Sequence, residues 1–302
     1  MAQGSAAAVH TVAVVLTLSH RTTYTADEEI AFRHVRRYLG RYHVYVVLPE
    51  SHAATYPDFR EVRVADRFFG SAQAHGTLLL SPAFYRRFLD YEYILVHHLD
   101  ALAFSDRLLD WCLSGYDYIG APWLRSPDTP HIGEEKVGNG GFSLRRVRAF
   151  LRVLASTRPF VDPDDYWRRY SQRTPPVERW LNLPRKYAKR LTHFNDIHWH
   201  IRWALAGDVH EDRFWAEYAT HYDPSFRIAP VDVAMRFAVE AEPRRCAERT
   251  GALPFGAHRW TRFDRDFFEP YLLHDGPGAN AVPLAIPESS TVSHLPSPVA
   301  QP

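Results

Sequence analysis

Short apolar runs alternate with amphipathic stretches along the first half of the chain. The runs at Thr11–Ser19, His43–Leu48 and Tyr93–Val96 are rich in β-branched, aromatic and leucine residues and are bounded by polar ones, which is typical of buried strands. Between the first two runs, Thr25 and Glu28 match a capping box, and apolar residues then recur at helical spacing. A strand, a helix and a strand in this order predict a parallel pair with a right-handed crossover. The pattern therefore predicts an α/β fold with a central, mostly parallel sheet flanked by helices.

The rest of the chain predicts less regular elements. We expect a strand at Glu61–Ala65, a helix at Pro82–Phe88 in the second half of Ser71–Leu89, a helix from Ser105 to Gly115 with Leu108, Leu109 and Cys112 facing inward, a strand-like run at Tyr116–Trp123, mixed strand and turn at Arg227–Glu240, and a glycine turn at Pro254–Trp260. Residues 156–206, crowded with Trp, Tyr, Arg and Pro, indicate a helical insertion or lid within a single domain at 9–275. Small polar residues at 1–8 predict a flexible tail, and the Gly, Pro, Ala and Ser of 276–302 predict a disordered one.

Composition narrows the class of protein. A chain of 302 residues, 46% hydrophobic and 24% charged, can bury a large core. Its net charge of +1 gives no general attraction to nucleic acid or membranes, so an anionic ligand has to be held by local features. Two cysteines cannot build a disulfide framework, and the apolar run Val9–Leu18 is too short to span a bilayer and lacks the basic flank of a signal peptide. We therefore expect a cytoplasmic protein without stable membrane insertion.

The most unusual stretch is the end of the third apolar run. Tyr93–Val96 leads directly into His97, His98, Leu99 and Asp100. A carboxylate and imidazoles at the end of a buried strand need partners, and strand ends are where ligands bind in α/β sheets. Because side chains alternate along a strand, His97 points away from His98 and is expected to be a core histidine.

Other segments carry candidate chemistry of their own. The first strand delivers Thr17, Ser19, His20 and Arg21 to its C-terminal end, without the GxGxxG or GxxxxGK[ST] pattern of dinucleotide and P-loop sites. The glycines around Asn139 permit close approach of a ligand to the backbone, although a plain hairpin turn fits the same pattern. Glu211 and Asp212 precede an aromatic helix, where acids also favour any helix N-terminus, and His258 lies in the glycine turn.

Taken in order, the segments YILVHHLDA, GYDYIGAPW, GNGGFSLRRV, HEDRFW and PFGAHRW resemble a bacterial family of suspected glycosyltransferases that has long been catalogued as a domain of unknown function. The resemblance covers roughly Val9–Leu272 and is interrupted by the inserted segment. More distantly, the chain is similar to the GT-A fold of metal-dependent transferases that use nucleotide sugars. The resemblance thus implies a GT-A-like fold.

The resemblance also implies a metal site. The resemblance makes His98, Leu99 and Asp100 the counterpart of the Asp-x-Asp metal motif, with Asp100 as the remaining carboxylate, His98 in place of the first aspartate and Leu99 beside the donor. His258 corresponds to a late histidine ligand. The implied cofactor is Mn²⁺ or Mg²⁺ bridging the two phosphates of the donor, and imidazole ligands favour Mn²⁺.

The catalytic residues implied by the resemblance lie in two further motifs. The turn at Asn139, Gly140 and Gly141 corresponds to the place where donor sugar and acceptor meet. Asp212 would be the base that deprotonates the acceptor hydroxyl, with inversion at the anomeric carbon, and Glu211 would contact a sugar hydroxyl or the metal shell. Trp123, Trp167 and Trp180 are candidate platforms for sugar faces or core residues. The implied reaction transfers a sugar from a nucleotide diphosphate donor, expected to be a uridine diphosphate sugar, to a hydroxyl of a saccharide or small molecule.

Two alternatives stay open on the sequence. The first is a metal-dependent hydrolase that uses His97, His98 and Asp100 together with a second cluster at His193, Asp196, His198 and His200, whose spacing matches no standard zinc motif. The second is a non-catalytic module that binds a nucleotide or carbohydrate, suggested by the missing first aspartate. The number of subunits is not predicted.

Overall fold

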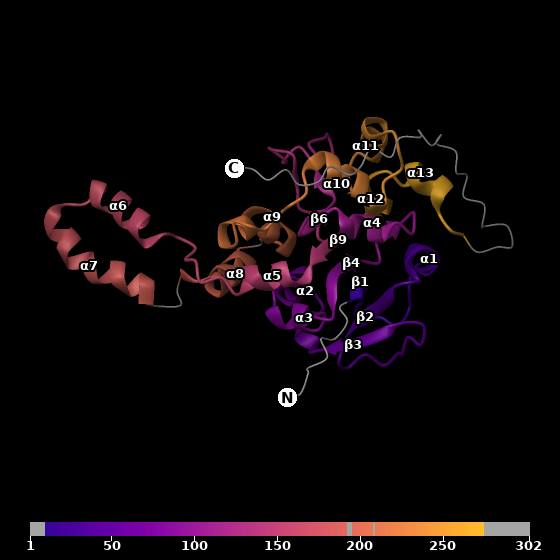
Figure 1. Cartoon of the computed structure of the whole chain (residues 1–302), viewed down its shortest axis with the longest axis horizontal. Helices are drawn as coiled ribbons and strands as arrows, with labels where there is room; N and C mark the ends of the chain where they lie inside the picture. Colours follow the sequence, from indigo (N-terminus) through magenta and orange to yellow (C-terminus); the bar gives the residue numbers. More distant parts are fainter. Residues whose placement is uncertain (1–9, 192–194, 208, 275–302) are drawn as a thin grey trace, which may run out of the picture.

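The centre of the molecule is a six-stranded sheet with strand order β3-β2-β1-β4-β9-β6 (Figure 1). The computed structural model describes residues 10–191, 195–207 and 209–274, so the predicted tails and His193 lie outside the described residues. The strands are β1 (His10–Thr17), β2 (His43–Pro49), β3 (Arg60–Val64), β4 (Tyr91–His97), β6 (Tyr118–Gly120) and β9 (Phe142–Arg146). Every strand but β9 runs in one direction, because β9 alone pairs antiparallel, with β4 on one side and β6 on the other. The predicted α/β fold class with a mostly parallel sheet is confirmed.

Helices cover both faces of this sheet. Alternate residues of β1 show the division, since Val14 packs with the first group of helices and Val15 with the second. The first face is covered by α1 (Ala26–His34), its π-helical continuation at Val35–Leu39, α4 (Leu108–Leu113) and α10 (Val231–Phe237). The second is covered by α2 (Ala72–Leu79), α3 (Pro82–Arg86), α5 (Val147–Leu154), α8 (Ile197–Ala206) and α9 (Glu211–Tyr222). Burial on both faces explains why the strands read as continuous apolar runs.

A small sheet with the order β10-β11-β5 stands beside the C-terminal end of β4. It consists of β10 (Ala238–Val239), β11 (Gly256–His258) and β5 (Ala101–Ala103), and its register sets His258 opposite Ala101, the residue after Asp100. Helix α11 (Pro243–Thr250) connects β10 to β11, and the short helices α12 (Trp260–Phe263) and α13 (Arg265–Phe268) follow β11. Strands β7 (Pro122–Trp123) and β8 (Lys136–Val137) form a separate two-stranded ribbon. The small sheet thus joins the late motif to the end of β4.

A helical hairpin of α6 (Pro163–Arg173) and α7 (Pro176–Leu191) projects from the body in Figure 1. Its two ends meet at Asn195, whose side-chain amide donates to the Val161 carbonyl at 2.7 Å while its oxygen accepts from the Val161 N–H at 2.9 Å. The Phe160 N–H also donates to the Asn195 carbonyl, at 2.8 Å. Of the region predicted as an insertion, α8 instead packs into the core, so the projecting part is the hairpin alone.

Several local predictions are settled by the structure. The capping box of α1 is confirmed, with the Glu28 N–H donating to the Thr25 hydroxyl at 3.2 Å and the Thr25 N–H to the Glu28 carboxylate at 2.8 Å. The inward orientation of Leu109 is wrong, since its side chain is 37% exposed.

Three helices also differ from the predictions: one in its first residue and two in their presence. Helix α4 begins at Leu108 without a side-chain cap, rather than at Ser105. The segment Arg227–Glu240, predicted as strand and turn, instead forms α10 and the short strand β10. Pro230 stands at the start of α10, which is helical although it contains Val231 and Val233. Helix α2, capped by the Ser71 hydroxyl, was not expected. No helix among the described residues is both long and apolar enough to cross a bilayer.

Candidate functional site

A cavity of about 660 Å³ opens at the C-terminal end of β4. Nine of the predicted site residues line it: His98, Asp100, Trp123, Asn139, Gly140, Gly141, Glu211, Asp212 and His258. They come from segments spread along the chain between His98 and His258, and the small sheet and strand β9 bring them to one place. The cavity is large enough for a small-molecule ligand.

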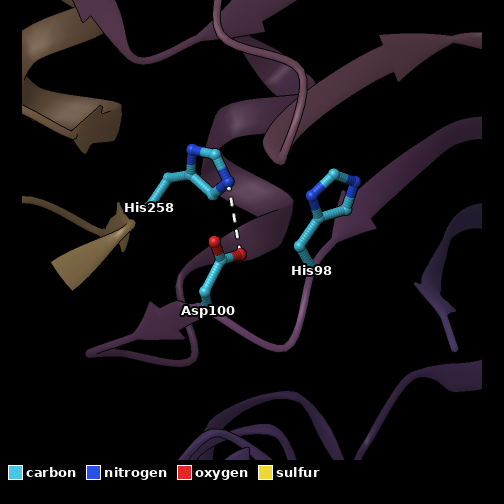
Figure 2. Close-up of side chains that lie close together, drawn as sticks. All are labelled: His98, Asp100 and His258. Carbon is cyan, nitrogen blue, oxygen red and sulfur yellow. Dashed lines mark ion pairs between the residues drawn. The ribbon is translucent and has the colours of Figure 1, made fainter. Parts of the chain in front are cut away.

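His98, Asp100 and His258 form a candidate metal centre in one wall of this cavity (Figure 2). One ligand atom from each lies within 4.8 Å of the other two, and the His258 Nε2 atom is 3.3 Å from an Asp100 oxygen. Asp100 follows β4 on a turn, and its carboxylate is half-exposed to the cavity, whereas His258 is buried. Across the part of the chain that the structure describes, these three side chains are the group close enough together to hold a metal ion.

The donor set fits a divalent cation. Both ring nitrogens of His258 are buried, and each faces a carboxylate: Nε2 lies 3.3 Å from Asp100 and Nδ1 lies 3.4 Å from Glu240. Burial alone would lower the pKa of His258, but Asp100 and Glu240 outweigh it and raise the pKa to about 9. Burial likewise acts to raise the pKa of Asp100, and the hydrogen bond and charge of His258 lower it below its usual range. A proton on His258 therefore balances the acids, and a divalent cation would replace it at the same nitrogen.

Glu240 and Asn139 support His258 on the side of its Nδ1 atom. Glu240 follows β10, lies 3.4 Å from the Nδ1 atom of His258 and accepts from the Asn139 amide at 2.7 Å. The Asn139 oxygen in turn accepts from the Gly141 N–H at 3.0 Å, which fixes the glycine turn. Asn139 is buried, so its role in the structure is to connect the turn to Glu240 rather than to face the cavity with its whole side chain.

His75 of α2 contacts the centre from the opposite side. Its Nε2 atom lies 3.1 Å from the Nε2 atom of His98, and burial lowers the pKa of His75 to about 4. The His98 N–H donates to the Gly141 carbonyl at 2.8 Å, which ties the end of β4 to the glycine turn. In a pair of neutral imidazoles the N–H of one ring donates to the bare nitrogen of the other, so His75 orients the His98 ring.

Gly141 is required by close packing against the metal centre. A Cβ atom at this position would lie 2.1 Å from the His258 Nε2 atom, so Gly141→Ala must displace the imidazole. We expect the affinity for Mn²⁺, measured by calorimetry, to fall about 10–100-fold. Gly133→Ala is the matched control, because Gly133 lines the same cavity with nothing within 4 Å of the added atom. Equal Mn²⁺ affinities for both variants would contradict the assignment of His258.

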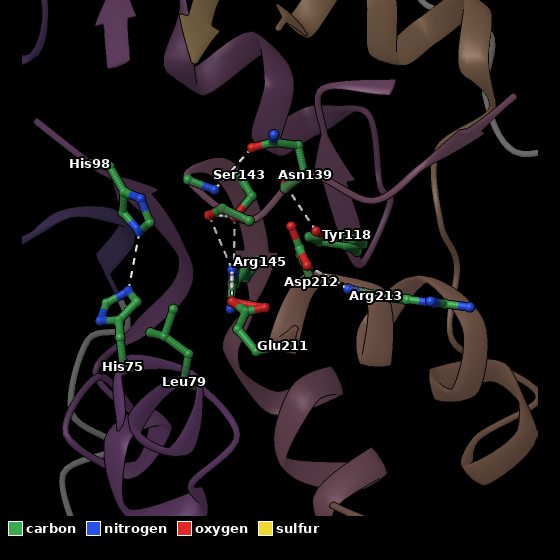
Figure 3. Close-up of polar contacts among 12 residues, drawn as sticks. His75, Leu79, His98, Tyr118, Asn139, Ser143, Arg145, Glu211, Asp212 and Arg213 are labelled. Carbon is green, nitrogen blue, oxygen red and sulfur yellow. Dashed lines mark hydrogen bonds and ion pairs between the residues drawn. The ribbon is translucent and has the colours of Figure 1, made fainter. Parts of the chain in front are cut away.

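Glu211 and Asp212 lie at the start of α9 and make different contacts (Figure 3). Glu211 is buried and forms an ion pair with Arg145 at 2.6 Å. Arg145 is itself fully buried and also donates to Tyr85, Ser143 and the Gly140 carbonyl at 3.0, 2.9 and 3.2 Å. Burial raises the pKa of Glu211 to about 7 against the opposing charge of Arg145. Glu211 therefore serves to hold the guanidinium that supports the glycine turn.

Asp212 keeps its carboxylate available to the cavity. One of its oxygens accepts from the Arg213 N–H at 2.7 Å, and among the described residues Asp212 forms no ion pair with a basic side chain. Burial raises the pKa of Asp212. A carboxylate with a raised pKa at the edge of a cavity has the properties of a general base.

Other predicted residues lie elsewhere. Thr17, Ser19, His20, Arg21 and Leu99 are not among the residues that line the cavity, although β1 ends beside β4 at the same edge of the sheet. Arg21 is occupied in an ion pair with Glu28. Trp167 and Trp180 lie on the projecting hairpin, away from the cavity lining.

Of the histidines invoked for a hydrolase, His98 belongs to the candidate metal centre, whereas His97 and His200 do not. His97 is fully buried against Phe142, with its Nδ1 atom 2.7 Å from the His98 carbonyl oxygen, as expected for a core histidine. His200 is buried and bonded to the Tyr222 hydroxyl at 2.8 Å, and Asp196 caps α8. Among the described residues, neither histidine joins a metal-binding group.

Several cavity residues were not predicted from the sequence: His75, Lys136, Glu217, Glu240, Arg259 and Arg262. Arg145 lies in the segment GNGGFSLRRV, but the sequence alone predicts no role for it. Nothing in the sequence marks Arg259 as unusual. In the structure its backbone is left-handed with φ of 48°, a strained conformation for a residue with a side chain. The others sit on short elements whose positions depend on contacts distant in sequence.

Comparisons with solved structures find glycosyltransferases. The galactosyltransferase LgtC in complex with donor and acceptor sugar analogues is similar over 88% of this chain and 98% of that chain, with 12% identity and a TM-score of 0.44. An active-site mutant of LgtC gives 13% identity and a TM-score of 0.42 over the same shares. The catalytic domain of Drosophila β1,4-galactosyltransferase 7, in complex with xylobiose, gives 19% identity and a TM-score of 0.28 over 48% of this chain and 52% of that chain, so this chain spans about half of it.

The sequence itself matches one family model. No protein with a curated description matches the chain. The family model covers residues 58–258, a span that begins later than the resemblance predicted and contains the glycine turn, the acidic pair and His258. The predicted membership in a family catalogued as a domain of unknown function is confirmed. Since the match extends over more than half of the chain, this protein belongs to the family described as "Protein of unknown function (DUF5672)".

Proposed function

We propose that this protein is a glycosyltransferase that moves a sugar from a nucleotide diphosphate donor, expected to be a uridine diphosphate sugar, to a hydroxyl of a saccharide or other small acceptor. One observation carries the proposal: a candidate metal centre and an acidic pair face the same cavity of about 660 Å³. A nucleotide sugar has a diphosphate next to the carbon that reacts, so its transfer needs a cation and a base within the length of one ligand. The cavity offers both.

His98, Asp100 and His258 are the residues that would hold the cation. When bound, Mn²⁺ or Mg²⁺ supplies positive charge that neutralises the diphosphate leaving with the nucleoside. A set of two imidazole nitrogens and one carboxylate oxygen favours Mn²⁺ over Mg²⁺, which prefers oxygen ligands. His75 and Glu240 orient the two imidazoles from opposite sides.

Asp212 is the proposed base. Its carboxylate faces the cavity, its pKa is raised by burial, and it can therefore accept the proton of the acceptor hydroxyl as that oxygen attacks the anomeric carbon. Glu211 is engaged by Arg145 and is assigned to holding the turn. Direct attack by an activated acceptor inverts the configuration at the anomeric carbon.

Further contacts complete the proposal. Trp123 and the turn at Asn139, Gly140 and Gly141 are assigned to the sugar and the acceptor, because all four line the cavity. We assign five residues near the end of β1 and β4 to the nucleoside end of the donor, since β1 ends next to β4: Thr17, Ser19, His20, Arg21 and Leu99.

We also propose a reducing compartment, the cytoplasm, because Cys112 and Cys246 are free thiols in the core.

Donor binding tests the proposal directly. In a thermal-shift panel of nucleotide sugars, we expect a uridine diphosphate sugar to raise the Tm only when Mn²⁺ is present, because a ligand of the native state stabilises it. Asp100→Ala is expected to remove this shift by removing the carboxylate of the metal centre. Asp128→Ala is the control, since Asp128 is an exposed carboxylate at the same cavity.

Slow hydrolysis of the donor without acceptor, lost in Asp100→Ala, separates a transferase from a non-catalytic binding module. Tightly retained zinc together with ester or amide hydrolysis, unaffected by nucleotide sugars, would instead favour the hydrolase. A donor shift that is identical in wild type and Asp100→Ala would refute the metal assignment.

A further inference from the structure

Helix α7 of the projecting hairpin carries an apolar stripe on its outer side. Val177, Trp180, Leu181 and Pro184 follow the i, i+3, i+4, i+7 spacing of one helix face, and Tyr187 continues it. The Val177, Trp180 and Leu181 side chains are 72, 77 and 75% exposed. A face with this spacing normally packs against a core, yet here it is open.

Polar contacts on the opposite side of α7 fix this orientation. The Asn182 amide donates to the Tyr170 hydroxyl of α6 at 2.7 Å, and Lys186 forms an ion pair with Asp164 of α6 at 2.8 Å. Helix α7 therefore packs on α6 through its polar side. The rotation of the helix about its axis keeps the apolar stripe away from α6.

The hairpin also concentrates positive charge. Residues 163–191 contain eight basic and three acidic side chains, a net charge of +5, whereas the whole chain has +1. Two of the three lysines of the chain, Lys186 and Lys189, belong to α7. The hairpin is therefore strongly basic, and the remainder of the chain has a net negative charge.

A basic helix with an open stripe of tryptophan, leucine and valine matches the surface of an anionic bilayer. Such helices lie in the plane of the interface, with the apolar face among the acyl chains and basic groups at the phosphates. We propose that the α6–α7 hairpin docks this protein reversibly on membranes that contain anionic lipids. The hairpin projects from the body, so this contact leaves the sheet and the cavity unobstructed (Figure 1). The proposal does not depend on the reaction performed in the cavity.

Vesicle co-sedimentation of the full chain tests the docking. We expect binding to mixed phosphatidylcholine and phosphatidylglycerol vesicles and little binding to pure phosphatidylcholine. The double variant Trp180→Ala, Leu181→Ala should bind about tenfold more weakly because it removes the centre of the stripe. Arg185→Ala should lose about fivefold, the contribution of one basic residue near an anionic surface.

Two controls are matched to these variants. Leu113 is an exposed leucine on α4 and Arg37 an exposed arginine beside α1, so Leu113→Ala and Arg37→Ala should bind vesicles like wild type. Vesicles with brominated acyl chains should quench a part of the tryptophan fluorescence that is absent in Trp180→Phe. An unchanged Tm for each variant shows that the fold is kept.

Three results would overturn the proposal. The first is wild-type protein that stays in solution with anionic vesicles. The second is equal vesicle binding by wild type and the double variant. The third is a dimer or a DNA complex that depends on Trp180 while vesicles are not bound, which would assign the stripe to a second copy of the chain or to a nucleic acid.

Discussion

Asp212→Asn is expected to abolish sugar transfer while leaving donor affinity unchanged. The amide keeps the size of the carboxylate and can still accept from the Arg213 N–H, but it cannot take up the proton of an acceptor hydroxyl. Loss of a general base lowers kcat by about 10²–10⁴-fold. The measurement is kcat for nucleotide diphosphate release with acceptor, alongside the donor Kd from calorimetry.

Asp128→Asn is the control for this prediction, because Asp128 is an exposed carboxylate among the residues that line the same cavity. It should keep both kcat and donor Kd. Parallel losses of kcat and of donor affinity in Asp212→Asn would instead mean that Asp212 binds the donor. A transfer rate that survives in Asp212→Asn would require another base.

The second large effect is on stability. Arg145→Ala is expected to lower the free energy of unfolding by about 3–5 kcal/mol, because it leaves the buried Glu211 carboxylate without its partner. The same change removes the hydrogen bonds that the Arg145 guanidinium donates to Tyr85, Ser143 and the Gly140 carbonyl. The glycine turn should therefore loosen as well. Urea denaturation followed by circular dichroism gives the free energy.

Arg107→Ala is the control, since Arg107 forms an exposed ion pair with Asp110 and should change stability by less than about 1 kcal/mol. Where Arg145→Ala does not fold, Glu211→Gln provides the same test from the other partner. A cost within the range of the Arg107 control in either buried variant would mean that the buried pair does not stabilise the fold.

The sequence predicted the sheet better than the site. Apolar runs such as Tyr93–Val96 are buried on both faces, and their composition alone identifies them as strands. The histidines and carboxylate after β4 could be recognised because they break such a run. Leu109 shows the limit of helical spacing, since a short helix has few neighbours to fix its rotation.

Glu240 and His75 could not be found in this way. Glu240 follows a two-residue strand, β10, whose place depends on pairing with β11, and that pairing depends in turn on β5. His75 lies on a helix whose sequence, with a glycine and a threonine, has low helical propensity. Their positions are products of contacts between segments far apart in the chain, which local patterns do not contain.

The hydrogen bonds between Asn195 and Val161 make the α6–α7 hairpin a separable part of the molecule. Because the Val161 backbone and the Asn195 side chain join where the hairpin leaves and rejoins the body, the segment between them starts and ends at nearly one point. Local opening of α6 and α7 can then proceed as its own cooperative unit without disturbing strand pairing. Such an appendage can be exchanged, and with it the proposed docking on membranes, while the sheet and the cavity stay unchanged.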